Sequence, residues 1–253
     1  MKKNDPYCDY LSASSFEDFQ FLAKNNSLSK YKKIGFPDEL RKGYEKYIFK
    51  DILSKVGNLS QKNKSVLDIG PGCSDLPKIL IKHSKNLQQK LYFIDSEEML
   101  SQLPEAIHLK KIFGKFPDVF KEKNKLKYSF DVIILYSVVQ YLFNKKGFYK
   151  NLNLLFSKLN PGGQIIIGDI PNSSMRKRFF LSYSGLRFHK TQYSKEKLPK
   201  FLLADNDKSL MNDAHVFKIL KTARSFGYHA WIVSQDPKLP FYNRREDIVI
   251  ERP

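Results

Sequence analysis

The sequence predicts an α/β fold in which helices cover both faces of a mostly parallel β-sheet. Three observations lead to this prediction. Short apolar segments alternate with amphipathic segments from residue 65 to residue 171, which is the pattern of βαβ units. A glycine-rich turn follows the first of these apolar segments directly. The chain has 253 residues, of which 42% are hydrophobic, so one domain can bury a sizeable core.

Seven segments have the length and apolar content of β-strands. They are residues 65–69, 91–94, 107–113, 130–135, 164–168, 228–233 and 247–250. Residues 76–84 and 148–159 have the spacing of amphipathic helices, and a shorter helix is expected at Met99 and Leu100. Because short buried strands alternate with helices, the strands before residue 171 should lie parallel to one another.

The segments on either side of this core carry their own signals. Ser14 and Glu17 fit a capping box for a short helix, and Pro37 opens a longer helix that ends at Gly57. Residues 1–64 are therefore expected to form an N-terminal helical extension or lid. Residues 65–253 should form the main domain.

Residues 172–212 lack a clean periodicity and are expected to be irregular, whereas Asn212 caps a helix that runs to Gly227. An insertion between the fifth strand and the closing pair is where a substrate lid would lie, because lids are usually loops on a rigid scaffold. An ordinary surface excursion is an equally good interpretation.

The formal net charge of +18 raises the question of a polyanionic partner. Residues 1–64, 65–171 and 172–253 carry excesses of +5, +5 and +8, so the charge is spread along the chain. A spread charge favours solvated lysines and non-specific association over a defined site. Nucleic acid is therefore the less favoured partner.

Composition argues against several other classes of protein. No apolar run reaches the roughly 18–20 residues that a membrane span needs. The basic N-terminus leads into no apolar segment, as a signal peptide would require. Cys8 and Cys73 are the only cysteines, and the five histidines show no metal-ligand spacing. We therefore expect a cytoplasmic protein with no membrane span, no disulfide framework and no bound metal.

The strongest functional motif lies in residues 66–75, where Asp68, Gly70 and Gly72 form an Asp-x-Gly-x-Gly sequence. Glycines at the carboxyl end of a strand let the backbone approach a ligand closely, and α/β sheets bind nucleotides at such turns. The dinucleotide-binding motif needs a third glycine where this chain has Asp75. A dehydrogenase is therefore not expected.

The motif resembles that of the class I S-adenosylmethionine-dependent methyltransferases, with Ser74 in place of the family's third glycine. Three further features follow in the family's order. They are Asp95 at the end of the second strand, residues 130–137, and the Pro-Gly-Gly turn within residues 159–163. The resemblance implies a Rossmann-like sheet of seven strands, with helices on both faces and an antiparallel last strand.

The resemblance also implies how S-adenosylmethionine, and its product S-adenosylhomocysteine, would be held. Asp95 would accept hydrogen bonds from the ribose hydroxyls. The adenine would lie after the third strand, where Gly114 and Lys115 stand in place of the acidic residue of many relatives. The expected cofactor-binding residues are Asp68, Gly70, Pro71, Gly72, Ser74, Asp95, Ser96, Gly114, Lys115, Phe116, Tyr136 and Ser137.

Methyl transfer requires chiefly alignment and exclusion of water, and a general base only when the acceptor arrives protonated. Asp169, just after the fifth strand, is the first candidate for this base, and His189 is the second. A turn carboxylate and a structural histidine are the alternative interpretations. The expected substrate-binding residues are Asn172, Arg176 and Arg178, since guanidinium groups bind phosphate or carboxylate bidentately.

The leading hypothesis is a methyltransferase that modifies O or N of a small, polar, anionic acceptor. Residues 168–172 and 243–247 loosely resemble methyltransferases of bacterial surface-sugar biosynthesis. This resemblance implies a sugar, a nucleotide-linked sugar or a phosphorylated amine of polysaccharide biosynthesis as the acceptor. The alternatives are an RNA methyltransferase, motivated by the net charge, and a non-catalytic cofactor-binding protein of the same fold.

Overall fold

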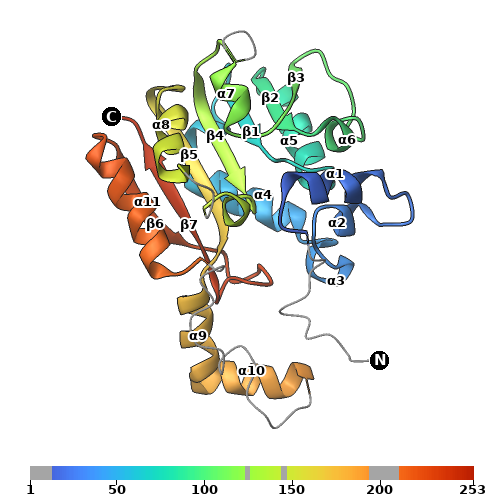
Figure 1. Ribbon diagram of the computed structural model, residues 1–253, viewed down its shortest axis with the longest axis vertical. Coiled ribbons are helices and arrows are strands. Elements are labelled where there is room, and N and C mark those ends of the chain that lie inside the picture. Colours follow the sequence, from blue (N-terminus) through green and yellow to red (C-terminus); the bar gives the residue numbers. More distant parts are fainter. Residues whose placement is uncertain (1–12, 123–125, 144–146, 194–210) are drawn as a thin grey trace.

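A computed structural model describes residues 13–122, 126–143, 147–193 and 211–253 of the chain (Figure 1). In this part of the chain, seven strands form one sheet in the order β3-β2-β1-β4-β5-β7-β6. The strands are β1 (Ser65–Ile69), β2 (Lys90–Asp95), β3 (Leu109–Phe113), β4 (Phe130–Tyr136), β5 (Leu159–Pro171), β6 (His229–Ser234) and β7 (Arg245–Glu251). Strands β1 to β5 pair in parallel, and β7 runs antiparallel to both β5 and β6. The predicted mostly parallel sheet with an antiparallel last strand is confirmed.

The helices fall into three groups by position in the chain. Those before β1 are α1 (Phe16–Lys24), α2 (Lys30–Lys33), α3 (Asp38–Arg41), α4 (Glu45–Lys55) and the 3₁₀ helix η1 (Gly57–Ser60). Those between the parallel strands are α5 (Asp75–Asn86), α6 (Glu97–Leu100), α7 (Asp118–Lys121), η2 (Val139–Tyr141) and α8 (Phe148–Phe156). Those after β5 are α9 (Ser173–Leu181), α10 (Tyr183–Tyr193) and α11 (Asp213–Ser225). No helix in the described residues is both long and apolar enough to cross a membrane.

Two hydrophobic clusters lie on opposite faces of the sheet, because alternate residues of a strand point in opposite directions. From β4, Ile133 and Leu135 join the cluster that contains the apolar sides of α8 and α11. Val132 and Ile134 join the cluster that contains those of α4 and α5. Both faces of the central strands are therefore buried, which explains why their sequences are apolar at consecutive positions.

The carboxyl ends of β1, β2 and β4 meet at one edge of the sheet. Strand order reverses there, since the chain passes from β1 outward to β2 and β3 and then returns to β4 on the other side of β1. Ligands of open α/β sheets bind at such a switch point. Figure 1 shows α1, α2 and α3 gathered beside this edge, whereas α9 and α10 project away from the sheet.

The N-terminal helices differ from the prediction in two details. The capping box of α1 is formed by Ser15 and Asp18 and not by Ser14 and Glu17, because Asp18 occupies the third helical position. The single helix expected from Pro37 to Gly57 is two helices, α3 and α4. Gly43, with a φ of +84°, lies between them in the left-handed conformation that interrupts a helix.

Two predictions after residue 158 also need correction. The turn expected at residues 160–163 lies inside β5, where a register shift between Phe130 and Val132 of β4 accommodates it. The stretch 172–212 is not irregular where the structure describes it, because it forms α9 and α10. Residues 194–210 of this stretch, and residues 1–12 of the N-terminal extension, lie outside the described residues.

A buried ion cluster fastens α4 to β7 beneath the same edge. The Lys55 ammonium lies 2.5 Å from the Asp51 carboxylate and 2.7 Å from the Asp247 carboxylate. Burial raises the pKa of Asp247, which is fully buried, and the ammonium of Lys55 opposes that rise. The cation therefore compensates two carboxylates that have been removed from water.

We expect Lys55→Met to lower the free energy of unfolding by about 3–5 kcal/mol, because it leaves two buried carboxylates without their cation. Lys64→Met is the control, since Lys64 is more exposed and lies 3.8 Å from Asp131. It should cost about 1 kcal/mol or less. Urea unfolding measures both, and equal losses would contradict the role given to Lys55.

Candidate functional site

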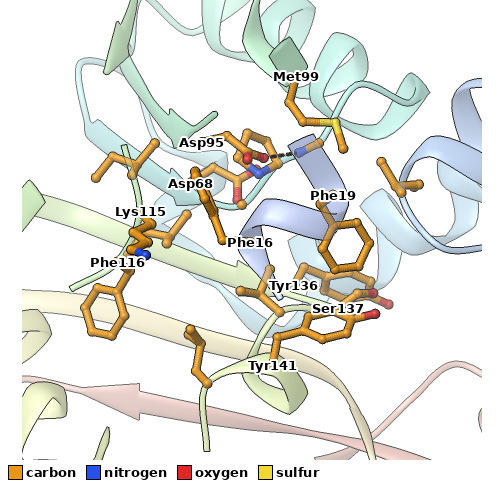
Figure 2. Close-up of a pocket in the computed structure, with 18 of the residues that line it drawn as sticks. Phe16, Phe19, Asp68, Asp95, Met99, Lys115, Phe116, Tyr136, Ser137 and Tyr141 are labelled. Atoms are coloured by element: carbon orange, nitrogen blue, oxygen red, sulfur yellow. Dashed lines mark hydrogen bonds between the residues drawn. The ribbon is translucent and has the colours of Figure 1, made fainter. Parts of the chain in front are cut away.

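A pocket of about 1000 Å³ opens at the switch point of the sheet. Its floor comes from the carboxyl ends of β1, β2 and β4 and from the residues that follow β3. Its cover comes from Phe16 and Phe19 of α1 (Figure 2). Ile34, Phe36 and Arg41, around α2 and α3, complete this cover. This volume includes solvent at the open mouth of the pocket.

The glycine turn after β1 exposes backbone atoms, uncovered by side chains, at the pocket wall. Gly70 and Gly72 have φ angles of +73° and +66°, which side chains rarely allow. A Cβ on Gly72 would lie 2.6 Å from the Ile34 Cγ2, and one on Gly70 would lie 2.7 Å from the Val138 Cγ2. The two glycines thus permit both the turn and the close approach of the pocket's cover.

Asp95 is held at the end of β2 by two backbone donors. The Gly72 N–H donates to its Oδ2 at 3.0 Å, drawn as the dashed line in Figure 2, and the Ser96 N–H donates to its Oδ1 at 2.7 Å. Burial raises the pKa of Asp95 to about 6, although these hydrogen bonds oppose the rise. The carboxylate is therefore fixed in position, with lone pairs left for a ligand.

A second carboxylate, Asp68, lies at the base of the same pocket. Burial, together with the nearby charge of Asp95, raises the pKa of Asp68 to about 8. A cation placed in the pocket would reverse part of this rise, because it favours the ionised form. The two acids make the pocket suited to a ligand that carries positive charge and hydroxyl donors.

Helix α1 covers the pocket with aromatic rings, and Figure 2 shows Phe16 and Phe19 pointing into it. The Phe19 ring meets the Tyr141 ring edge-on at 4.8 Å between centroids. A salt bridge of 2.9 Å joins Glu17 to Lys115 across the pocket mouth. These contacts connect the N-terminal extension to the loops after β3 and β4.

Arg41 is a pocket residue that sequence reasoning missed. It is buried, its guanidinium lies 4.7 Å from the Phe36 ring and 5.8 Å from the Tyr136 ring, and its Nε has no hydrogen-bond acceptor. Its nearest carboxylate, that of Glu45, is 3.7 Å away. No sequence signal separates this arginine from the other cations of the chain, since its burial depends on how α3 packs.

Ten of the twelve expected cofactor-binding residues line the pocket. They are Asp68, Gly70, Pro71, Gly72, Asp95, Gly114, Lys115, Phe116, Tyr136 and Ser137. The other two are buried at helix starts behind it. Ser74 occupies the N-cap position of α5, and the Ser96 hydroxyl caps α6 by accepting from the Met99 N–H at 3.2 Å.

Asp169 lies behind the pocket wall, in contact with Ser137, which lines it. The Ser137 hydroxyl donates to the Asp169 Oδ2 at 2.5 Å, and the Arg245 guanidinium donates to the same oxygen. The Gln235 amide donates to Oδ1 at 3.3 Å. Ser137 and Asp169 both have positive φ, +59° and +57°, although neither is glycine. Such backbone strain concentrates at functional sites.

The remaining expected site residues do not line the pocket. Asn172 caps α9 by accepting from the Ser174 and Met175 N–H groups, and Arg178 pairs with Asp213 at 2.5 Å. His189 is buried on α10 against the Phe180 ring, and Arg176 lies on α9. The contacts of Asn172, Arg178 and His189 favour structural roles in holding α9 and α10 together and to the body.

No protein-family model matches the chain, and no curated protein matches it either. Solved structures do. The N-methyltransferase NodS from Bradyrhizobium japonicum WM9, in complex with S-adenosylhomocysteine, is 14% identical, with a TM-score of 0.58 over 95% of this chain and 100% of that chain. The plantazolicin methyltransferase BpumL, also with S-adenosylhomocysteine, is 16% identical, with a TM-score of 0.56 over 94% and 96%. The methyltransferase domain of bacterial CtHen1 is 16% identical, with a TM-score of 0.54 over 83% and 98%.

The chain has the class I methyltransferase fold. At these identities the likeness concerns the path of the chain and not its chemistry. The match to NodS covers 95% of this chain, so the likeness extends beyond the seven strands of the sheet.

The glycine turn offers a test of the pocket's geometry. Gly72→Ala should lose about 1–3 kcal/mol of unfolding free energy more than Gly43→Ala. Both changes place a side chain at positive φ, but only Gly72 has a neighbour within 3 Å, and nothing lies within 4 Å of a Cβ on Gly43. Urea unfolding of the two variants compares them. Equal losses would mean that Ile34 does not press on the turn.

Proposed function

We propose that the protein is a methyltransferase that binds S-adenosylmethionine in the pocket at the switch point. The observation that carries this proposal is the Asp95 carboxylate, fixed by the Gly72 and Ser96 N–H groups, at the floor of the switch-point pocket in a chain of this fold. A fixed carboxylate acceptor suits a ribose, whose two adjacent hydroxyls can donate to it.

The other polar groups of the pocket match the rest of the cofactor. Arg41 is suited to the carboxylate of the methionine part, because its buried Nε has no acceptor within the protein. Asp68 is suited to that part's ammonium. Lys115 and Phe116 lie after β3, where the adenine is expected, and Phe116 offers an apolar ring there. A Cβ on Gly70 or Gly72 would narrow the space that the ligand needs.

The bound cofactor would supply a methyl group on a positively charged sulfur. The protein's part is to orient the acceptor and to exclude water. Phe19, Phe36, Tyr136 and Tyr141 provide an aromatic wall, which also attracts a cation through the faces of its rings. We propose that α1 acts as the lid of this site, held by the Glu17–Lys115 salt bridge.

Ser137 is the polar side chain that the acceptor would meet, and Asp169 would act through it. The Ser137 hydroxyl donates a hydrogen bond to Asp169, so the lone pairs of the hydroxyl oxygen are available to an N–H or O–H donor in the pocket. The Arg245 guanidinium donates to the same Asp169 oxygen, and the Ser137 hydroxyl is the donor in its own hydrogen bond to that oxygen. Asp169 is thus a positioning residue in this proposal, and the acceptor atom is a nitrogen or an oxygen.

The acceptor is proposed to be a small, polar, anionic compound, such as a nucleotide-linked sugar or a phosphorylated amine of surface polysaccharide biosynthesis. The formal net charge of +18 is spread along the chain and favours association with anionic compounds in general. Transfer of labelled methyl groups to such compounds, with neutral sugars and RNA as comparisons, tests this class. Labelling of RNA alone would replace the small acceptor with nucleic acid.

Calorimetric titration should show binding of both S-adenosylmethionine and S-adenosylhomocysteine, and no binding of NAD. Asp95→Ala should weaken binding by about 10- to 100-fold, since hydrogen bonds to a charged acceptor are lost. Asp118→Ala removes an exposed carboxylate and should leave the affinity unchanged. No binding by the folded wild-type protein would contradict the proposal.

The same titration should depend on pH. The pKa of Asp95 in the free protein is about 6, and only the ionised carboxylate offers its full set of acceptors. Affinity should therefore fall as the pH drops below about 6, by up to about tenfold per unit. Asp95→Asn should abolish this step while leaving any step from Asp68 at higher pH. A step near 6 that persists in Asp95→Asn would assign it to another group.

Asp169→Asn and Ser137→Ala should lower kcat, because the acceptor loses its fixed hydrogen-bond partner, while the affinity for S-adenosylhomocysteine stays within about threefold. The loss should be largest at low pH, where the acceptor carries its proton. A purely structural role would predict loss of folded protein with unchanged kcat per folded molecule. Thermal unfolding measured beside the kinetics separates the two.

A further inference from the structure

Three arginines alternate with two aromatic rings beside the pocket. The Arg41 guanidinium lies 4.7 Å from the Phe36 ring, and the Arg245 guanidinium lies 5.5 Å from the same ring. The Arg245 guanidinium also lies 4.3 Å from the Phe241 ring, and the Arg244 guanidinium lies 4.8 Å from that ring. Both rings are buried, and their centroids are 6.4 Å apart. Phe36 is therefore the ring that joins Arg41 to the other two arginines.

Phe36 is held in place by its backbone and by its ring. Its N–H donates to the Tyr31 carbonyl at 3.0 Å, which closes the turn after α2. The Arg245 guanidinium that the ring contacts is itself anchored by a hydrogen bond to Asp169. The Phe36 side chain thus has a fixed position in the pocket wall, which it helps to line.

Ring contacts, and not a hydrogen bond to a carboxylate, hold the Arg41 guanidinium. Its Nε lies 3.7 Å from the Glu45 Oε1, which is too far for a hydrogen bond, and within the described residues both atoms are buried without a hydrogen-bond partner. The other oxygen of Glu45 accepts from the Asp75 N–H at 3.1 Å. The Phe36 and Tyr136 rings lie 4.7 Å and 5.8 Å from the guanidinium. Guanidinium groups stack on aromatic faces, and the attraction is stronger where water is excluded.

We propose that Phe36 is a positioning residue for cofactor binding and that it acts through Arg41. The ring holds the guanidinium at the pocket wall, in the orientation that receives the carboxylate of the cofactor's methionine part. This inference rests on the proposed function, because it concerns how the cofactor of that function is held. An arginine whose orientation is already fixed loses less freedom when the ligand binds, so the ring increases the affinity.

Titration of the full chain with two ligands tests this role. S-adenosylhomocysteine carries the amino-acid part, whereas 5′-methylthioadenosine has the same nucleoside without it. Phe36→Met fills the space with a flexible side chain and removes the ring. It should weaken binding of S-adenosylhomocysteine by about 3- to 30-fold, the range of a buried cation–π contact, and should change that of 5′-methylthioadenosine by less than about twofold. Phe36→Tyr keeps a ring and should bind both ligands as the wild-type protein does.

A double-mutant cycle separates positioning from direct contact with the ligand. Arg41→Met should weaken binding of S-adenosylhomocysteine by about 10- to 100-fold, since a charged hydrogen-bond donor is lost. Adding Phe36→Met to it should cost less than about a further twofold, because no guanidinium is left to position. Phe49→Met is the matched control and should leave both affinities unchanged. Phe49 is buried to a similar degree, but its ring meets that of His83 and does not line the pocket.

The outcomes separate this inference from the proposed function. Equal weakening of both ligands by Phe36→Met, or an undiminished loss in the Arg41→Met background, would overturn the positioning role. Weaker binding of S-adenosylhomocysteine by Glu45→Gln but not by Phe36→Met would assign the orientation of Arg41 to the carboxylate and would overturn it too. No binding of either ligand by the folded wild-type protein would contradict the proposed function, and this inference with it. Thermal unfolding checks that each variant is folded, and Phe36→Leu takes the place of Phe36→Met if that variant does not fold.

Discussion

The hydrogen bond from the Gly72 N–H to the Asp95 carboxylate joins the turn after β1 to the end of β2, and the pocket depends on it. Only a residue without a side chain can make this turn, because a Cβ on Gly72 would press into Ile34. The bond holds a carboxylate where burial disfavours its charge, as the pKa of about 6 shows. The protein thus holds the Asp95 carboxylate, whose burial is unfavourable, in position before any ligand binds. Preorganisation of this kind reduces the cost of binding.

A second constraint lies behind the pocket, where charges are buried in pairs. Lys55 compensates Asp51 and Asp247, Arg245 compensates Asp169, and the Gln235 amide donates to both Asp169 and Asp247. This arrangement both stabilises the sheet edge and orients Ser137. It explains why a catalytic candidate such as Asp169 can be buried and fully bonded and still influence the pocket through one hydroxyl.

Much of the fold could be predicted from the sequence, because its information is local. The apolar residues at consecutive positions 130–135 predict a buried strand, and Gly70 and Gly72 predict the turn that ends β1. The split between α3 and α4 was missed because helical spacing continues across Gly43. Helices α9 and α10 were missed because their periodicity is weak: basic, polar and aromatic residues are mixed on both of them.

The site could be predicted where a residue's position along a strand fixes its place, as with Asp68 and Asp95. It could not be predicted where packing between distant segments decides. Arg41 reaches the pocket only because α3 folds over the sheet edge. Asn172 caps α9, and its side-chain amide donates to Asp213 and Glu246, which are 41 and 74 positions away in sequence. The position of Asp169 behind Ser137 likewise depends on contacts with β7, and no local sequence pattern predicts those contacts.

A crystal structure of the protein grown with S-adenosylhomocysteine tests the central claim most directly. The account predicts the ligand between the glycine turn and α1, with its ribose hydroxyls on the Asp95 carboxylate and its amino-acid part toward Arg41 and Asp68. A pocket without ligand at saturating concentration, or a ligand bound with its ribose away from Asp95, would contradict the account.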